Sequence, residues 1–180
     1  MKQRNKIILI LSILLSLIVL DHLTKWVAIH YLKDSGMSYH FLGDLFRLQY
    51  AENTGAFLSL GASLPDGVRS VVMTGLNTVI LGGLLLYMFL SRNIQRLPLC
   101  AFSLVAAGGI GNLIDRIFRD GRVVDFMNMG ITSSGFTLRT GIFNVADVAI
   151  MAGLFLVLLN EAFIISRKKS DNKDITKEKK

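Results

Sequence analysis

Hydrophobic residues gather along this chain into four long blocks and do not recur at the spacing of an amphipathic soluble helix. The blocks cover residues 7–29, 68–90, 98–117 and 142–165. Each block is close in length to the ~20 apolar residues that an α-helix needs to cross a bilayer. The pattern therefore predicts an all-α membrane protein with four transmembrane helices.

The first block follows basic residues, as the apolar stretch of a cleavable signal peptide does. No small-x-small cleavage site comes after its apolar stretch, and Asp21 and Lys25 interrupt the block instead. We therefore expect the segment to be retained as the first transmembrane helix.

Lysine and arginine collect at both chain ends and in the short joint between the second and third blocks, which together hold 12 of the 20 basic residues. By the positive-inside rule, this side and both termini are predicted to be cytoplasmic. The connections 30–67 and 118–141 then face outward. Alternation within residues 41–60 predicts short strands there, whereas 118–141 is rich in Gly, Ser and Thr. We expect one membrane domain over 1–166 and a basic, disordered cytoplasmic tail over 167–180.

The composition narrows the classes of function. Hydrophobic residues make up 52% of the chain, and the mean hydropathy is +0.50. The net charge of +7 lies largely at the chain ends, where it orients helices, so no nucleic-acid partner is expected. The single cysteine, Cys100, excludes an intrachain disulfide, and the three histidines form no HExxH motif. We expect no metal and no organic cofactor, and the lack of a GxSxG motif argues against a serine peptidase.

Polar residues in three of the blocks fall in the outer third of the predicted membrane. At ~1.5 Å of rise per helical residue, Asp21 lies roughly 21 Å up a ~30 Å apolar core, and Asn112 lies at about the same height. Asp147 enters from the outside and lies roughly 8 Å below the outer boundary. Each has a polar neighbour three or four positions away on its own helix face, namely Lys25, Arg116 and Asn144. Polar groups at such a depth usually face the interior of a helix bundle and mark a functional site.

Two of these pairs also have a purely structural interpretation. Asp21 and Lys25 could neutralise each other as an i,i+4 ion pair. Asn112 could clamp two helices together by hydrogen bonds while Arg116 reaches towards the lipid headgroups. Asp147 is harder to explain in this way, because its own helix carries no cation within one turn.

The expected companion of Asp147 is Asp125, which stands between Val-Val and Phe-Met in an apolar part of the outer connection. If this stretch folds back over the start of the fourth helix, the two carboxylates meet. Two adjacent carboxylates cannot both ionise comfortably, so one keeps a proton. Such a pair supplies a base that activates water and an acid that protonates a leaving amine, which is the chemistry of aspartic proteases.

A small proton- or ion-coupled transporter subunit is the alternative, because buried Asp and Asn residues also suit ion pathways. A path across the membrane needs polar groups through its whole thickness. The cytoplasmic half of every predicted helix is apolar, which argues against the transporter.

Five motifs, in order along the chain, closely resemble the signal peptidase II family of bacterial membrane aspartyl endopeptidases. They are "DHLTK" (21–25), "ENTGAF" (52–57), "GNLIDR" (111–116), "VVDF" (123–126) and "FNVAD" (143–147). Any one motif is weak, but five with this order and spacing are highly specific. The resemblance extends over most of the chain outside the charged tail.

The resemblance implies a four-helix membrane fold with a small extracytoplasmic β-rich cradle, and it implies that Asp125 and Asp147 are the catalytic pair. The supporting residues of the family fall on Asp21, Lys25, Asn53, Gly55, Asn112, Arg116 and Asn144. The implied substrate is a prolipoprotein whose lipobox cysteine already bears diacylglycerol, cleaved just before that cysteine. We expect a monomer in the bacterial inner membrane, in contact with membrane lipids, with its active site near the outer face.

Overall fold

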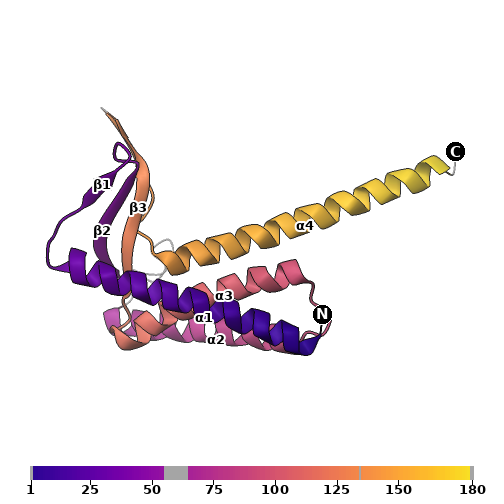
Figure 1. The fold of residues 1–180 in the computed structure, drawn as a ribbon, viewed down its shortest axis with the longest axis horizontal. Helices are drawn as coiled ribbons and strands as arrows, with labels where there is room; N and C mark the ends of the chain where they lie inside the picture. The colour runs from indigo at the N-terminus through magenta and orange to yellow at the C-terminus, as the bar shows by residue number, and fades with distance from the viewer. Residues whose placement is uncertain (1, 55–64, 134, 179–180) are drawn as a thin grey trace.

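Four helices dominate the computed structural model, which describes residues 2–54, 65–133 and 135–178 (Figure 1). Helix α1 (Gln3–Ala28) ends in a π-helical turn, η1 (Ile29–Lys33). The other helices are α2 (Asp66–Leu90), α3 (Arg96–Phe118) and α4 (Val145–Glu178). Each of the four is long and apolar enough to cross a membrane. The predicted four-helix membrane fold is confirmed.

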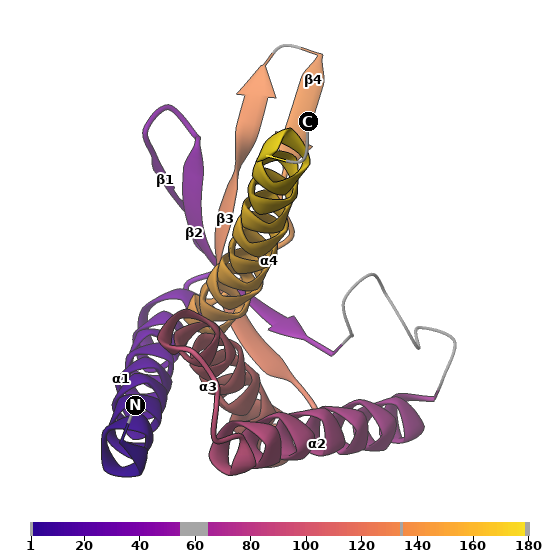
Figure 2. The ribbon, with the colours of Figure 1, turned by 90° about the vertical axis from the view of Figure 1, so that its right-hand side faces the viewer.

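Helix α3 is the centre of the helix packing, because it contacts α1, α2 and α4 (Figure 2). A methyl group in place of the Gly108 hydrogen would collide with the carbonyl oxygen of Ala146, so the small residue lets α3 and α4 approach closely. At the far end of the bundle, Lys6 is buried and its ammonium group donates to the carbonyl oxygens of Phe89 and Ser91. These bonds satisfy carbonyls at the C-terminal end of α2.

An antiparallel sheet of four strands stands at one end of the helices (Figures 1 and 2). Its strands, in spatial order, are β1 (Tyr39–Phe41), β2 (Phe46–Asn53), β3 (Val123–Ser133) and β4 (Phe136–Arg139). The register of β2 on β3 shifts between Leu48 and Ala51, and Ala51 lies opposite Asp125. Both predicted outer connections thus contribute a hairpin, and the β-rich cradle is confirmed.

Helix α4 runs further than the sequence pattern predicts. It continues as a helix to Glu178, through most of the tail 167–180 that we expected to be disordered. A long apolar helix already provides the costly nucleus, and Arg167, Lys168 and Lys169, which follow directly, propagate a helix readily. The start differs as well, because α4 begins at Val145 and not at residue 142.

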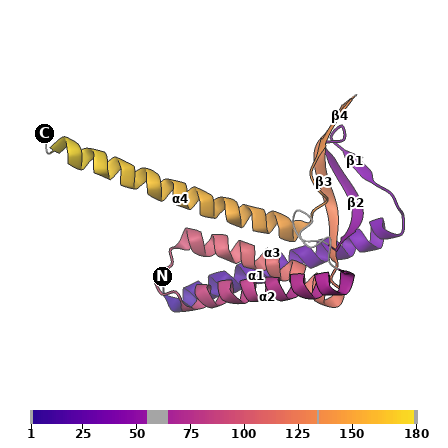
Figure 3. The ribbon, with the colours of Figure 1, turned by 180° about the vertical axis from the view of Figure 1, so that it is seen from behind.

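Both termini and the turn between α2 and α3 lie at the end of the helices away from the sheet (Figure 3). Among the described residues, this is the end that carries the basic residues counted above. The arrangement agrees with the predicted orientation, in which that end is cytoplasmic and the sheet lies outside; which side each end occupies stays a prediction.

Candidate active site

Strand β3 folds back against the segment just before α4. The backbone N–H groups of Phe126 and Met127 donate to the carbonyl oxygen of Phe143, at 3.1 and 2.8 Å, and the N–H of Phe143 donates to the carbonyl oxygen of Met127 at 2.8 Å. These bonds carry Asp125, the residue before Phe126, to the start of α4. The fold-back that the apolar surroundings of Asp125 suggested is therefore present.

The first turn of α4 is held by a reciprocal pair of hydrogen bonds. The Asn144 side-chain oxygen accepts from the backbone N–H of Asp147 at 2.9 Å, and an Asp147 carboxylate oxygen accepts from the backbone N–H of Asn144 at 3.1 Å. This is a capping box with Asn and Asp in its two positions. Asp21 of α1 adds a third acceptor, for the N–H of Ala146 at 2.9 Å. Negative charge is favourable here because the N-terminal end of a helix is electropositive.

Three side-chain amides donate hydrogen bonds to the two candidate acids, and two of them connect the acids to each other. Asn144 donates to Asp125 Oδ1 at 2.7 Å, and Asn53 donates to Asp125 Oδ2 at 3.0 Å. Asn112 donates to Asp147 Oδ1 at 2.8 Å. The Asn144 amide also donates to the Asn112 side-chain oxygen at 3.1 Å, which closes one network from Asp125 to Asp147. Residues from β2, β3, α3 and α4 meet in it.

The two acids differ in exposure. Asp125 is 2% exposed, whereas Asp147 is half-buried. The pKa of Asp125 is raised to about 6 from its ordinary value of 3.8, chiefly because burial disfavours the charged form and secondly because Asp147 is negative. The amides of Asn53 and Asn144 and the cation of Lys25 oppose this rise. Asp125 can therefore hold a proton close to neutral pH.

Beneath this network lies a buried ion cluster. Lys25 is fully buried, and its ammonium nitrogen lies 2.8 Å from Asp21 and 2.9 Å from Asp115. It also donates to the side-chain oxygen of Asn112 at 3.1 Å. The simple i,i+4 pair that the sequence suggested is thus one contact of a larger cluster.

Asp115 is the site residue that sequence reasoning missed. It is 1% exposed, accepts from the N–H of Val124 at 3.2 Å, and lies 3.0 Å from the Arg119 guanidinium. Its spacing from Asn112 was the available signal, because residues three apart share a helix face. A carboxylate on the face that carries Asn112 must be paired when that face is buried.

The other predicted supporting residues lie close by or outside the described structure. Arg116 is half-buried, donates to the backbone oxygen of Asn112 at 3.4 Å, and its charge interacts with those of Asp125 and Asp147. Gly55 lies outside the described residues. Within the described ranges, no group of three His, Cys, Asp or Glu side chains could hold a metal ion.

One face of the sheet is apolar and leads to Asp125. Side chains two apart on a strand share a face, so this face of β3 carries Met127, Met129 and Ile131. Their partners across the strands complete it, namely Tyr39, Phe41, Phe46, Leu48 and Leu138. Five of these side chains are exposed, namely Tyr39, Phe41, Met129, Ile131 and Leu138. An apolar surface therefore ends at a buried acid.

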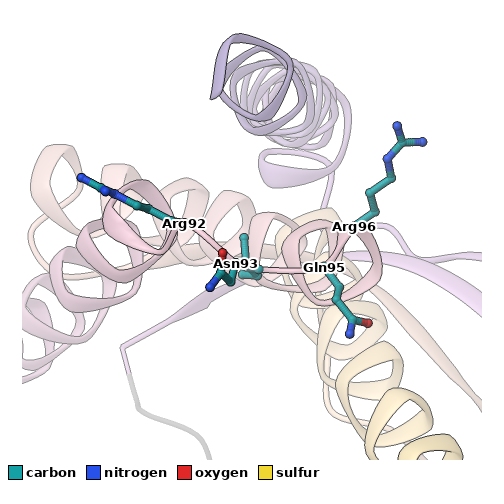
Figure 4. Close-up of a pocket in the computed structure, with 5 residues that line it drawn as sticks. Arg92, Asn93, Gln95 and Arg96 are labelled. Atoms are coloured by element: carbon teal, nitrogen blue, oxygen red, sulfur yellow. The ribbon is translucent and has the colours of Figure 1, made fainter. Parts of the chain in front are cut away.

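A hollow lies at the turn between α2 and α3, far from the two acids. Its lining includes Arg92, Asn93, Gln95 and Arg96, whose side chains point in different directions (Figure 4). Side chains that diverge in this way provide no converging set of groups for a ligand, so the amide-bridged acids remain the candidate site.

Comparison with known proteins agrees with this geometry. Residues 13–163 match a family described as signal peptidase (SPase) II. Lipoprotein signal peptidases from Chlorobium phaeovibrioides and Chlorobaculum tepidum are 42% and 38% identical, over 82% and 83% of this chain and 86% and 91% of theirs. A solved bacterial membrane enzyme structure is similar, with a TM-score of 0.70 and 25% identity over 88% of this chain and 90% of its own.

Proposed function

Because this chain belongs to the signal peptidase II family, we propose that it is an aspartic endopeptidase whose acids are Asp125 and Asp147. The family activity is the removal of signal peptides from prolipoproteins. The observation that carries the aspartic mechanism is the pair of carboxylates joined by the Asn112 and Asn144 amides at 2.7–3.1 Å. Nothing in the described residues favours the transporter alternative.

In the proposed reaction the two acids share one proton. The ionised carboxylate takes a proton from water as the water oxygen attacks the scissile carbonyl carbon. The neutral acid then protonates the departing nitrogen as the C–N bond breaks. The products are a signal peptide with a new C-terminal carboxylate and a lipoprotein with a free α-amine on its lipid-modified cysteine.

The surroundings of the acids support a lipid-bearing substrate. The apolar sheet face defined above leads to Asp125 and could hold the apolar residues next to the cleavage site. A cysteine anchored by diacylglycerol keeps its peptide bond near the membrane surface. The sheet end of the helices, where the acids lie, suits that position if this end faces outward. Asn53 and Arg116, with their amide and guanidinium donors, are proposed to orient the substrate backbone.

A cleavage assay with defined substrate tests this proposal. Purified protein is incubated with a diacylglyceryl-modified prolipoprotein in mixed lipid–detergent micelles, and the products are identified by mass spectrometry. We expect cleavage immediately before the modified cysteine, with chelator having no effect. Asp125→Asn and Asp147→Asn should each lose activity, whereas Asp34→Asn, which alters an exposed carboxylate, should retain it. Full activity in either of the first two variants would remove that acid from the mechanism.

A further inference from the structure

The buried ammonium of Lys25 determines how the Asn112 amide is oriented. An ammonium group has three donors and no acceptor, so the atom of Asn112 that faces Lys25 must be its oxygen. That oxygen lies 3.1 Å from Lys25 Nζ and accepts from Asn144 as well. The amide nitrogen of Asn112 must then face Asp147, 2.8 Å away. Lys25 therefore fixes which end of Asn112 meets the acid.

A backbone N–H group fixes Asn144 in the same way. The N–H of Asp147 can only donate, and the Asn144 side-chain oxygen accepts from it at 2.9 Å. The Asn144 amide nitrogen must then face Asn112 and Asp125. Two donors that cannot be reversed, the Lys25 ammonium and this N–H, thus set the direction of the hydrogen bonds that the Asn112 and Asn144 side chains make with each other and with the two acids.

The donors treat the two acids differently. Asp147 accepts from the Asn112 amide and also from the backbone N–H of Asn144 at the electropositive end of α4. Asp125 is 2% exposed, and it accepts from the side-chain amides of Asn53 and Asn144. A carboxylate at a helix N-terminus with a backbone donor is stabilised in its charged form, whereas a desolvated one favours its neutral form.

We propose that Lys25 is a positioning residue, which through Asn112 holds Asp147 as the ionised acid that activates water and leaves the shared proton on Asp125. This inference rests on the proposed peptidase function and assigns the two roles within it. Asp21 and Asp115 neutralise Lys25 where it lies, at 2.8 and 2.9 Å. Lys25 itself needs to touch neither the substrate nor water.

A double-mutant cycle with Asn112 tests whether Lys25 acts on Asp147 through Asn112, which we call the Lys25–Asn112 relay. Lys25→Met and Asn112→Ala should each lower kcat about 10²-fold while KM changes little, because each misplaces a group in the reacting geometry. The double variant should be no slower than Asn112→Ala alone, since Lys25 acts through Asn112. Arg119→Met is the matched control. This variant also removes a cation from Asp115, since the Arg119 guanidinium lies 3.0 Å from that carboxylate. Within the described residues, no hydrogen bond or ion pair joins Arg119 to Asn112. The kcat of Arg119→Met should therefore stay close to the parent value.

The outcomes separate the relay from a general loss of structure or charge. Independent, multiplicative losses in the double variant would overturn the proposal, as would a loss in Arg119→Met equal to that in Lys25→Met. If Lys25→Met does not fold, Lys25→Gln takes its place, because it keeps an N–H donor towards Asn112 and loses the charge. Its kcat loss should be smaller, and it should vanish in the Asn112→Ala background. A parent protein that does not cleave refutes the proposed function itself, whereas an active parent with uncoupled losses refutes only the role of Lys25.

Discussion

Replacing Asp125 by Asn should abolish cleavage and yet stabilise the folded protein above neutral pH. The pKa of Asp125 is about 6 in the folded protein, against an ordinary value of 3.8. A folded-state pKa above the unfolded value means that the stability linked to this proton is fully present below pH 3.8 and is lost as pH rises through about 6. The difference between these two pKa values corresponds to at most ~3 kcal/mol of unfolding free energy at pH 8. The Asn amide is neutral at every pH, so Asp125→Asn avoids the free-energy cost of holding a buried, ionised carboxylate.

Thermal unfolding in detergent between pH 4 and pH 8 measures this difference. Asp125→Asn should unfold several degrees above the parent at pH 8, and the two should converge at pH 4, where Asp125 is protonated. Asp34→Asn, at an exposed carboxylate, should follow the parent throughout. A constant offset between parent and Asp125→Asn across this pH range would show that Asp125 is not the acid with the raised pKa, and the explanation by burial would be refuted.

Three further predictions concern packing, charge and topology. Gly108→Ala should lower the free energy of unfolding by roughly 1–3 kcal/mol, because its methyl group meets the Ala146 carbonyl, whereas Gly83→Ala, with open space around it, should not; thermal unfolding compares the two. Glu52→Gln should lower stability at pH 7 by up to about 1 kcal/mol, because neighbouring cations lower the pKa of Glu52 to about 2 from 4.5. That stability is present above pH 4.5 and is lost as pH falls through about 2, so acid titration of unfolding should show the difference narrowing. A reporter fused after Lys180 should read cytoplasmic, and a periplasmic reading would reverse the orientation.

The four helices were predictable because crossing a bilayer demands a local property, about 20 consecutive apolar residues. Strand β2 was predictable in outline from alternation within residues 41–60, whereas β1 (Tyr39–Phe41) ends where that stretch begins. Strand β3 was not, because its partner β2 lies some 70 residues earlier in the chain, and β4 depends in turn on its pairing with β3.

The approach of Asp125 to the start of α4 was predictable, but most of the contacts around the two acids were not. Asn144 and Asp147 are three residues apart at the start of an apolar run, which is the spacing of a capping box. Asp21 appeared in the sequence to be paired only with Lys25, yet it also accepts from the N–H of Ala146 on α4. Asp115 was overlooked because its partners, Lys25 and Val124, come from other parts of the chain. Contacts between distant segments are the information that a local pattern lacks.

The most direct test of the central claim, that Asp125 and Asp147 act together on one peptide bond, is the single-turnover cleavage rate of Asp125→Asn, Asp147→Asn and the double variant. Residues that act as a unit give strongly non-additive losses. Each single variant should lose at least about 10³-fold, and the double variant should be no slower than the worse single one. Losses that multiply in the double variant, or a single variant that cleaves at the parent rate, would contradict the account.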